Sequence, residues 1–208
     1  MKFLFDLDGT VTSQETLPLI ASHFNCQEEI SELTKRTVAG NVPFIESFIR
    51  RVNILGKYSV CETSDLLSQV PLYPELKQFI DEHRSDCIIV TGNLTCWCDG
   101  LFRKIGCQCY GSTAELDGDH VVKLRSILRK EEIVDRYKAL GEMVVFIGDG
   151  NNDLEAMRHA NISIATGLTH NPAQSLLSIC DYVVFNERAL CRQLRQLCGE
   201  TGLQKSVV

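Results

Sequence analysis

The sequence has 208 residues, of which 44% are apolar, so it suits one compact domain with an insertion or two small domains that share one core. Lys and Arg total 21 against 27 Asp and Glu, and the net charge of −6 excludes the basic stripe of proteins that follow a nucleic-acid backbone. The apolar runs are far shorter than the roughly 20 residues of a membrane span, and Asp6 and Asp8 interrupt any signal-peptide pattern. We therefore expect a cytoplasmic protein with no nucleic-acid or membrane partner, whose oligomeric state the sequence leaves open.

Short apolar runs bounded by turn residues recur along the chain, with helical patterns between them. Strands that are apolar throughout are typical of a parallel sheet covered on both faces. The pattern therefore predicts an α/β fold with a doubly wound parallel sheet. The predicted strands are KFLFD at 2–6, CIIVT at 87–91, MVVFIG at 143–148, ISIA at 162–165 and DYVVF at 181–185.

The segment that follows the first predicted strand breaks this alternation. It shows no convincing strand, but it has four amphipathic stretches that predict helices. A helical segment inserted at this point is expected to lie above the carboxyl end of the first strand as a lid. We predict a small helical cap at 13–70, inserted into an α/β core formed by 1–12 and 71–208. The four stretches are QETLPLIASHF, EEISELTKRTV, PFIESFIRRVNIL and SVCETSDLLSQV.

Two further features lie between the second and third predicted strands. AELDGDHVVKL at 114–124 has a D-G turn between extended arms and predicts a β-hairpin. Cys96, Cys98, Cys107 and Cys109 have two interpretations, a zinc site or packing. Zinc sites usually have two to four residues between paired ligands, and positions two apart on a helix do not share a face, so we favour packing.

The predicted strands end in acidic residues. Side chains two apart along an extended strand point the same way, so Asp6 and Asp8 are expected to face one space. Asp149 and Asp153 follow the third strand, and the carboxyl ends of parallel strands meet in one crevice. Four acidic groups repel one another unless a cation neutralises them, and a set of oxygen ligands suits Mg²⁺.

The second strand offers groups that suit an anion. Thr91-Gly92-Asn93 is expected where a strand turns into a helix, so that a hydroxyl and backbone N–H groups can point at phosphate oxygens. Lys130, at the start of the helical run KEEIVDRYKAL, is preferred as the balancing cation over Lys123, which falls on the predicted hairpin. The five histidines are scattered without ligand spacing, and surface or capping positions are expected for them.

These strand-end motifs and the lysine, in their order along the chain, resemble the motifs of the haloacid dehalogenase superfamily, and within it those of the phosphoserine phosphatase-like branch. The matches are FDLDGT, VTGN, Lys130 and GDGNND, and with the cap the resemblance covers nearly the whole chain. It implies a Rossmann-like core and a phosphatase of small phosphate esters. It further implies that Asp6 is the nucleophile that becomes an aspartyl-phosphate and that Asp8 is the general acid and base. Mg²⁺ would be held by Asp6, the backbone carbonyl of Asp8 and Asp149, with Asp153 in support.

General chemistry agrees with these implied roles. A carboxylate that attacks a phosphate dianion meets charge repulsion, which Mg²⁺ and Lys130 would offset. Thr91, Gly92 and Asn152 would hold the equatorial phosphate oxygens. Asp8, kept protonated by its acidic neighbours, would donate a proton to the leaving alkoxide and then accept one from water.

The same resemblance gives an expectation for the substrate. In phosphoserine phosphatases a glutamate and an arginine of the cap contact the amino and carboxyl groups of serine, and Glu15 and Arg51 stand at the matching positions, with Phe44 at the matching aromatic. An ammonium pairs well with a carboxylate, and a carboxylate with a guanidinium. Each of the two charged residues has a plainer interpretation, Glu15 at a helix N-terminus and Arg51 on a solvated helix face. Phosphoserine is thus the best single expectation.

The sequence differs from the phosphoserine phosphatases at one motif, and this difference leaves other functions open. The phosphoserine enzymes usually carry a serine and two glycines where this chain has Thr91-Gly92-Asn93, so Asn93 adds bulk and hydrogen-bonding capacity beside the phosphate. A phosphatase or phosphotransferase for another small phosphate ester is the first alternative. A non-catalytic protein that binds a phosphate ligand is the second, disfavoured because binding alone needs neither a nucleophile nor an adjacent acid.

Overall fold

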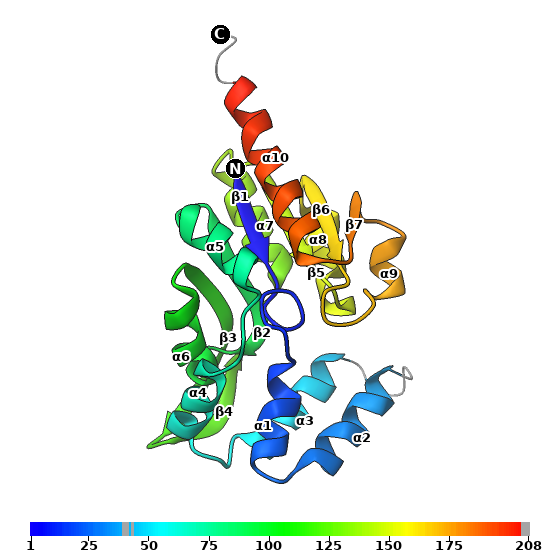
Figure 1. Cartoon of the computed structure of the whole chain (residues 1–208). Coiled ribbons are helices and arrows are strands. Elements are labelled where there is room, and N and C mark those ends of the chain that lie inside the picture. Colours follow the sequence, from blue (N-terminus) through cyan, green and yellow to red (C-terminus); the bar gives the residue numbers. More distant parts are fainter. Residues whose placement is uncertain (39–41, 43, 205–208) are drawn as a thin grey trace.

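The computed structural model describes residues 1–38, 42 and 44–204 (Figure 1). These residues form a seven-stranded sheet in the order β4-β3-β2-β1-β5-β6-β7, in which only β3 and β4 pair antiparallel. The predicted α/β fold with a doubly wound, mostly parallel sheet is confirmed. The strands are β1 (Lys2–Phe5), β2 (Cys87–Leu94), β3 (Gln108–Asp117), β4 (His120–Ser126), β5 (Val144–Gly148), β6 (Ile162–Thr166) and β7 (Tyr182–Val184).

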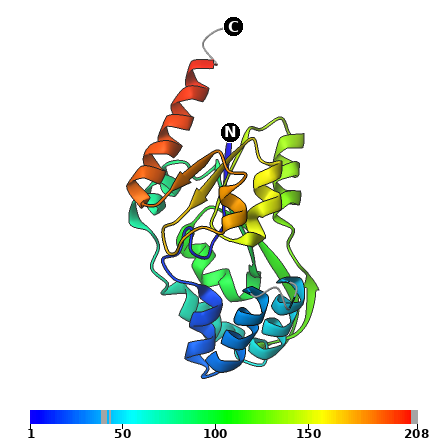
Figure 2. The same cartoon turned by 90° about the vertical axis from the view of Figure 1, so that its right-hand side faces the viewer.

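Helices cover both faces of this sheet (Figure 2). Since successive side chains of a strand point to opposite faces, Phe3 and Phe5 of β1 are buried in one layer and Leu4 in the other. The first layer holds α5 (Pro74–Glu82), α6 (Thr95–Ile105) and α10 (Glu187–Gln204), and the second holds α7 (Lys130–Ala139), α8 (Leu154–His159) and α9 (Gln174–Leu177).

Strand β1 lies between β2 and β5, and this position brings the residues that follow the three strands close together. Phe5 is in register with Ile89 of β2 and with Ile147 of β5. The chain leaves β1 at Asp6 and leaves β5 at Asp149, so the acidic residues that follow the two strands meet at one edge of the sheet.

Among the residues that the structure describes between β1 and α5, four helices are present. α1 (Thr16–His23), α2 (Gln27–Val38) and α3 (Phe44–Leu55) lie beyond the carboxyl ends of the strands, in the lower part of Figure 1. α4 (Val60–Ser68) lies instead along α6, where the backbone N–H of Gly100 donates to Ser64 Oγ at 2.9 Å. The last helix of this segment is therefore fastened to a helix that covers the sheet.

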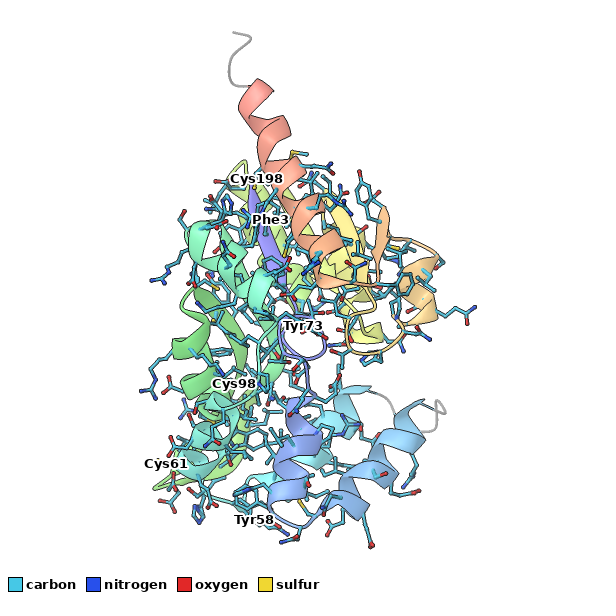
Figure 3. The ribbon with its side chains drawn as sticks, in the orientation of Figure 1. Phe3, Tyr58, Cys61, Tyr73, Cys98 and Cys198 are labelled. Carbon is cyan, nitrogen blue, oxygen red and sulfur yellow. The ribbon has the colours of Figure 1, made fainter. Side chains whose placement is uncertain are left out.

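The chain enters and leaves this helical segment at adjacent points. Thr12 and Leu72 form an isolated antiparallel bridge, and the N–H of Ser13 donates to the Pro71 carbonyl at 3.1 Å. Figure 3 shows Tyr73 at the junction between the helical segment and the sheet. The bridge therefore brings together the two ends of segment 13–70, for which a cap was predicted.

The predicted hairpin is confirmed, because β3 and β4 pair antiparallel around a turn at Gly118. β3 begins earlier than the predicted hairpin arm, at Gln108, and its first half pairs parallel with β2. The four cysteines considered above lie nearby. Cys96 and Cys98 are on α6, Cys107 precedes β3 and Cys109 lies within it. All four belong to the first hydrophobic layer or pack against it.

Within the described residues, no helix combines the length and the apolar composition that crossing a membrane requires.

Candidate active site

A cavity of about 200 Å³ opens at the carboxyl ends of β1, β2 and β5, beneath α1 and α3. It is lined both by residues that follow the strands and by residues of the helical segment 13–70. The lining residues are Asp6, Asp8, Glu15, Leu17, Phe48, Arg51, Thr91, Gly92, Asn93, Asp149, Gly150, Asn152 and His170.

A buried lysine joins two carboxylates at the base of this site. Lys130 Nζ donates to Asp6 Oδ1 at 2.5 Å and to Asp153 Oδ1 at 2.6 Å, and all three side chains are at most 6% exposed. Burial and the charge of Asp153 raise the pKa of Asp6 well above its usual value, although Lys130 opposes them. The two carboxylates raise the pKa of Lys130 against the effect of burial, so the lysine is held as a cation.

Asp153 also holds the turn after β5. Its Oδ2 accepts hydrogen bonds from the backbone N–H groups of Asp149 at 3.1 Å and Gly150 at 3.0 Å, while its Oδ1 accepts from Lys130. The side chain is fully buried, so each of these bonds is formed away from water. Asp153 therefore fixes the backbone that carries Asp149 as well as contributing charge.

Asp8 lies in the same cavity and is tied to the start of α1. The N–H of Thr16 donates to Asp8 Oδ1 at 2.6 Å. Burial and the nearby charge of Glu15 raise the pKa of Asp8 to about 6, and the hydrogen bond from Thr16 only partly opposes this rise. A carboxyl group with such a pKa can be protonated near neutral pH and can both donate and accept a proton.

Asp149 completes the group of buried carboxylates. Thr10 Oγ1 donates to Asp149 Oδ1 at 3.0 Å, and His170 Nε2 lies 2.9 Å from Asp149 Oδ2. Burial and the charge of Asp153 raise the pKa of Asp149 to about 7. Gly9, with φ of +72°, passes so close that a Cβ there would lie 2.8 Å from Asp149 Oδ2, so both its conformation and its space require glycine.

The donor set suits a divalent cation. Asp6, Asp149 and Asp153 each offer a carboxylate oxygen, and these oxygens lie within 4.8 Å of one another. Lys130 contacts two of these three buried carboxylates, Asp6 and Asp153. Burial first, and then the charge of Asp153, raise the pKa of Asp6 and of Asp149, so a cation at this point would stabilise their ionised forms. Carboxylate oxygens are the ligands that Mg²⁺ prefers.

The predicted phosphate-binding stretch lines the cavity, but with a different local structure. β2 continues to Leu94 and α6 begins at Thr95, so Thr91-Gly92-Asn93 lies within the strand and not at the turn into the helix. The Asn93 side chain is buried; its Nδ2 donates to Thr16 Oγ1 at 2.7 Å and its Oδ1 accepts from the N–H of Leu94 at 2.7 Å. Both polar atoms of this amide therefore have partners within the protein.

The residues of the helical segment reach the cavity from α1 and α3. Glu15 and Arg51 both line it; burial lowers the pKa of Arg51, and the charge of Glu15 opposes that shift. The side chain of Phe44 lies outside the described part of the structure. Leu17 and Phe48 line the cavity too, and neither is a predicted site residue.

His170 is a further residue that the sequence did not point to. It was expected on the surface or at a helix cap, but its half-exposed side chain lines the cavity and contacts Glu15 and Asp149. Burial lowers its pKa, but the hydrogen bond with the Asn171 carbonyl and the charge of Asp149 outweigh burial, so the pKa of His170 is raised. Thr10 and Thr16, which contact Asp149 and Asp8, were also missed.

Known proteins resemble this chain along most of its length. The profile of haloacid dehalogenase-like hydrolases matches residues 3–161. Phosphoserine phosphatase of Saccharomyces cerevisiae is 26% identical over 178 residues, which cover 78% of this chain and 58% of the yeast protein. Phosphoserine phosphatase of Campylobacter jejuni subsp. doylei is 25% identical over 175 residues, which cover 78% of this chain and 84% of that protein. The chain thus spans little more than half the length of the yeast relative.

Solved structures share the fold. A substrate-bound phosphoserine phosphatase complex superposes with a TM-score of 0.75 at 20% identity, and the match covers 94% of this chain and 98% of that one. At this level of identity the likeness shows the arrangement of the elements and leaves the activity to be argued from the site.

Proposed function

Because the chain belongs to the haloacid dehalogenase-like hydrolases, we propose that it is a Mg²⁺-dependent phosphomonoester hydrolase that forms an aspartyl-phosphate intermediate. Its substrate would be a small phosphorylated metabolite, with phosphoserine the first choice. One observation carries the proposal: Asp6, fixed by Lys130 at 2.5 Å, shares a cavity with Asp8, a second carboxyl group whose pKa is about 6. The family membership itself confirms the prediction made from the four motifs.

Asp6 is the nucleophile in this proposal. One of its oxygens attacks phosphorus, the bond from phosphorus to the leaving oxygen breaks, and the phosphoryl group remains on Asp6. Lys130 donates to Oδ1 of the same carboxylate and so holds the side chain in one orientation, while its positive charge offsets the repulsion between carboxylate and phosphate.

Asp8 moves the protons. In its protonated form it donates to the leaving alkoxide, and the resulting carboxylate then takes a proton from the water that hydrolyses the aspartyl-phosphate. The hydrogen bond from the N–H of Thr16 to Oδ1 fixes the orientation of Asp8 during both steps.

Other residues would bind the phosphate and the cation. Thr91, Gly92 and Asn152 line the cavity where the equatorial phosphate oxygens would lie. Asp6, Asp149 and the backbone carbonyl of Asp8 would hold Mg²⁺, with Asp153 in support through its hydrogen bonds to Lys130 and to the backbone of Asp149. When bound, the cation would supply positive charge against the phosphate and the carboxylates.

The choice of phosphoserine has two supports. The curated relatives are phosphoserine phosphatases, and Glu15 and Arg51 line the same cavity as Asp6. A carboxylate and a guanidinium in one small cavity match the ammonium and carboxylate of an amino acid.

The test is phosphate release from a panel of phosphomonoesters with Mg²⁺, including L-phosphoserine, sugar phosphates and nucleotides. Asp6→Asn removes the nucleophile and keeps the size of the side chain, so we expect it to abolish turnover. An unchanged rate in Asp6→Asn would refute the mechanism. If phosphoserine has the highest kcat/KM, the roles of Glu15 and Arg51 in substrate binding are supported.

A second candidate is a phosphatase or phosphotransferase for a different small ester. Asn93 favours it, because its amide joins β2 to the start of α1 through Thr16 and so helps to set the shape of the cavity. Asn93→Gly is expected to change the ranking of substrates or acceptor alcohols, and an unaltered ranking counts against this candidate. Tight binding of an ester without phosphate release would instead favour the non-catalytic alternative.

A further inference from the structure

His170 joins two carboxylates that come from different parts of the chain. It lies in the loop between β6 and α9, and its Nε2 is 3.2 Å from Glu15 Oε1 and 2.9 Å from Asp149 Oδ2. Its Nδ1 is 3.0 Å from the carbonyl oxygen of Asn171. A backbone carbonyl and an ionised carboxylate accept hydrogen bonds, so toward these groups the ring acts as the donor.

The contacts of His170 with Glu15 and Asp149 reduce the repulsion between these two carboxylates. The ligand atoms of Glu15, Asp149 and His170 lie within 4.8 Å of one another, so the two carboxylates are close enough to repel. Without a donor beside them, Glu15, whose side chain is 42% exposed, can lower this repulsion by turning toward solvent. The imidazole therefore opposes a movement of Glu15 away from the cavity.

The loop that carries His170 is anchored on both sides of that residue. Thr169 Oγ1 donates to the Gly9 carbonyl at 3.1 Å and lies 2.9 Å from the Tyr73 hydroxyl. On the other side, the N–H of Ala173 donates to the Asp149 carbonyl at 2.8 Å. These bonds connect the loop to the chain after β1, to the connection before α5 and to the turn after β5, so the core holds the backbone on both sides of His170.

We propose that His170 is a positioning residue for substrate selection, which holds the Glu15 carboxylate in the cavity so that it can receive the ammonium group of a phosphorylated amino acid. The inference rests on the proposed function, because it assigns Glu15 to the substrate's ammonium. It adds His170 to Glu15 and Arg51 as a third residue for substrate binding. His170 comes from the core, and it would favour an amino ester over the ester in which a hydroxyl replaces the ammonium group.

The test compares two esters that differ only at this point: O-phospho-L-serine, and the 3-phosphoglycerate of matching configuration, in which a hydroxyl replaces the ammonium. Dissociation constants are measured by calorimetry with Mg²⁺ in the Asp6→Asn background, so that neither ester turns over. The readout is the ratio of the two constants, because a merely structural loss weakens both esters alike and leaves the ratio unchanged.

We expect His170→Ala to reduce the preference for phosphoserine by about fivefold or more, the usual size of coupling between neighbouring sites. His170→Gln places an amide N–H where Nε2 stands and should restore part of the preference. His170→Asn reaches only as far as Nδ1 and should not. His159→Ala is the matched control, since His159 has similar exposure and an aspartate partner, Asp135, but does not line the cavity.

Three results would overturn the inference: an equal weakening of both esters in His170→Ala, tighter binding of phosphoserine in that variant, or no preference for phosphoserine with His170 intact. The first would mean that His170 serves Asp149 or the phosphate, and the second that it competes with the ammonium for Glu15. Phosphate release by the unaltered protein is measured in parallel on the wider panel. Its absence refutes the proposed function, whereas release without an amino-ester preference refutes only the role of His170.

Discussion

Lys130 is the single cation among the described residues that contacts both Asp6 and Asp153, and it is buried with them. Its removal would leave two buried carboxylates without their shared donor. Breaking a buried pair by deleting one partner is costly because the remaining charge has neither water nor a counter-charge. We therefore expect the lysine to contribute to stability as well as to the proposed reaction.

We predict that Lys130→Met lowers the free energy of unfolding at neutral pH by about 3–5 kcal/mol without added metal. Loss of the charge opposite the phosphate should also reduce the rate of phosphate release at least about 100-fold. Denaturant unfolding and a phosphate assay measure the two effects. Lys123→Met, at an exposed position of β4, is the control and should change neither. Full activity in Lys130→Met would contradict this role.

The sequence located the acidic residues better than their partners. Asp6, Asp8, Asp149 and Asp153 were placed at strand ends because buried strands are easy to recognise and parallel strands end at one edge. Phe48 could have been found, since it lies one turn before Arg51 on the same face of α3. His170 could not, because it stands in a loop that has no periodic pattern, and only the folded chain brings it to Glu15.

Helices and strands show the same difference between features that a local sequence pattern predicts and features that depend on contacts distant in sequence. The five predicted strands were found because each is mostly apolar, whereas the first half of β3, from Gln108, reads QCYGS and is not. It becomes a strand because it pairs with β2, a contact distant in sequence. In α4 the amphipathic pattern indicated a buried face without saying that this face meets α6.

The contact between α4 and α6 depends on a glycine. A Cβ at Gly100 would lie 2.8 Å from the Ser64 carbonyl and 3.0 Å from the Ser68 Cβ, so a methyl group must push α4 away from α6. The hydrogen bond from the Gly100 N–H to Ser64 Oγ would be strained by the same movement. α4 is thus held at the distance that only glycine permits.

We predict that Gly100→Ala lowers the free energy of unfolding by about 1–3 kcal/mol, the usual cost of overpacking. Gly199→Ala in α10 is the matched control, because the space around Gly199 is open and alanine favours a helix by up to about 1 kcal/mol. Both are measured by denaturant unfolding. Equal stability of Gly100→Ala and the unaltered protein would show that α4 can shift without cost.

For the molecule as a whole, the raised pKa values of the site carboxyls link stability to pH. The pKa is about 6 for Asp8 and about 7 for Asp149, against 3.8 for an ordinary aspartate. Between these values the folded protein binds protons that the unfolded chain has lost, so the free energy of unfolding decreases as pH rises. The raised pKa of His170 acts in the same direction.

We predict that the metal-free protein is more stable at about pH 5 than at about pH 8 and that Mg²⁺ stabilises it mainly at the higher pH, because protons and the cation compete for the same carboxylates. Thermal unfolding at both pH values, with Mg²⁺ and with a chelator, measures this difference. Asp149→Asn should lose most of the gain from Mg²⁺. A gain of equal size at both pH values would contradict the prediction.

The adjacent connections at Thr12 and Leu72 affect how segment 13–70 can change during evolution. Paired residues on antiparallel strands lie about 5 Å apart, so the two ends of segment 13–70 are neighbours. A segment with such ends can be lengthened, shortened or exchanged without altering the register of the sheet. Glu15 and Arg51 belong to this segment, whereas Asp6, Lys130 and Asp149 do not. Residues 13–70 and the core therefore both contribute side chains to the cavity, and a change in this segment alters one wall of the cavity while Asp6, Lys130 and Asp149 keep their places.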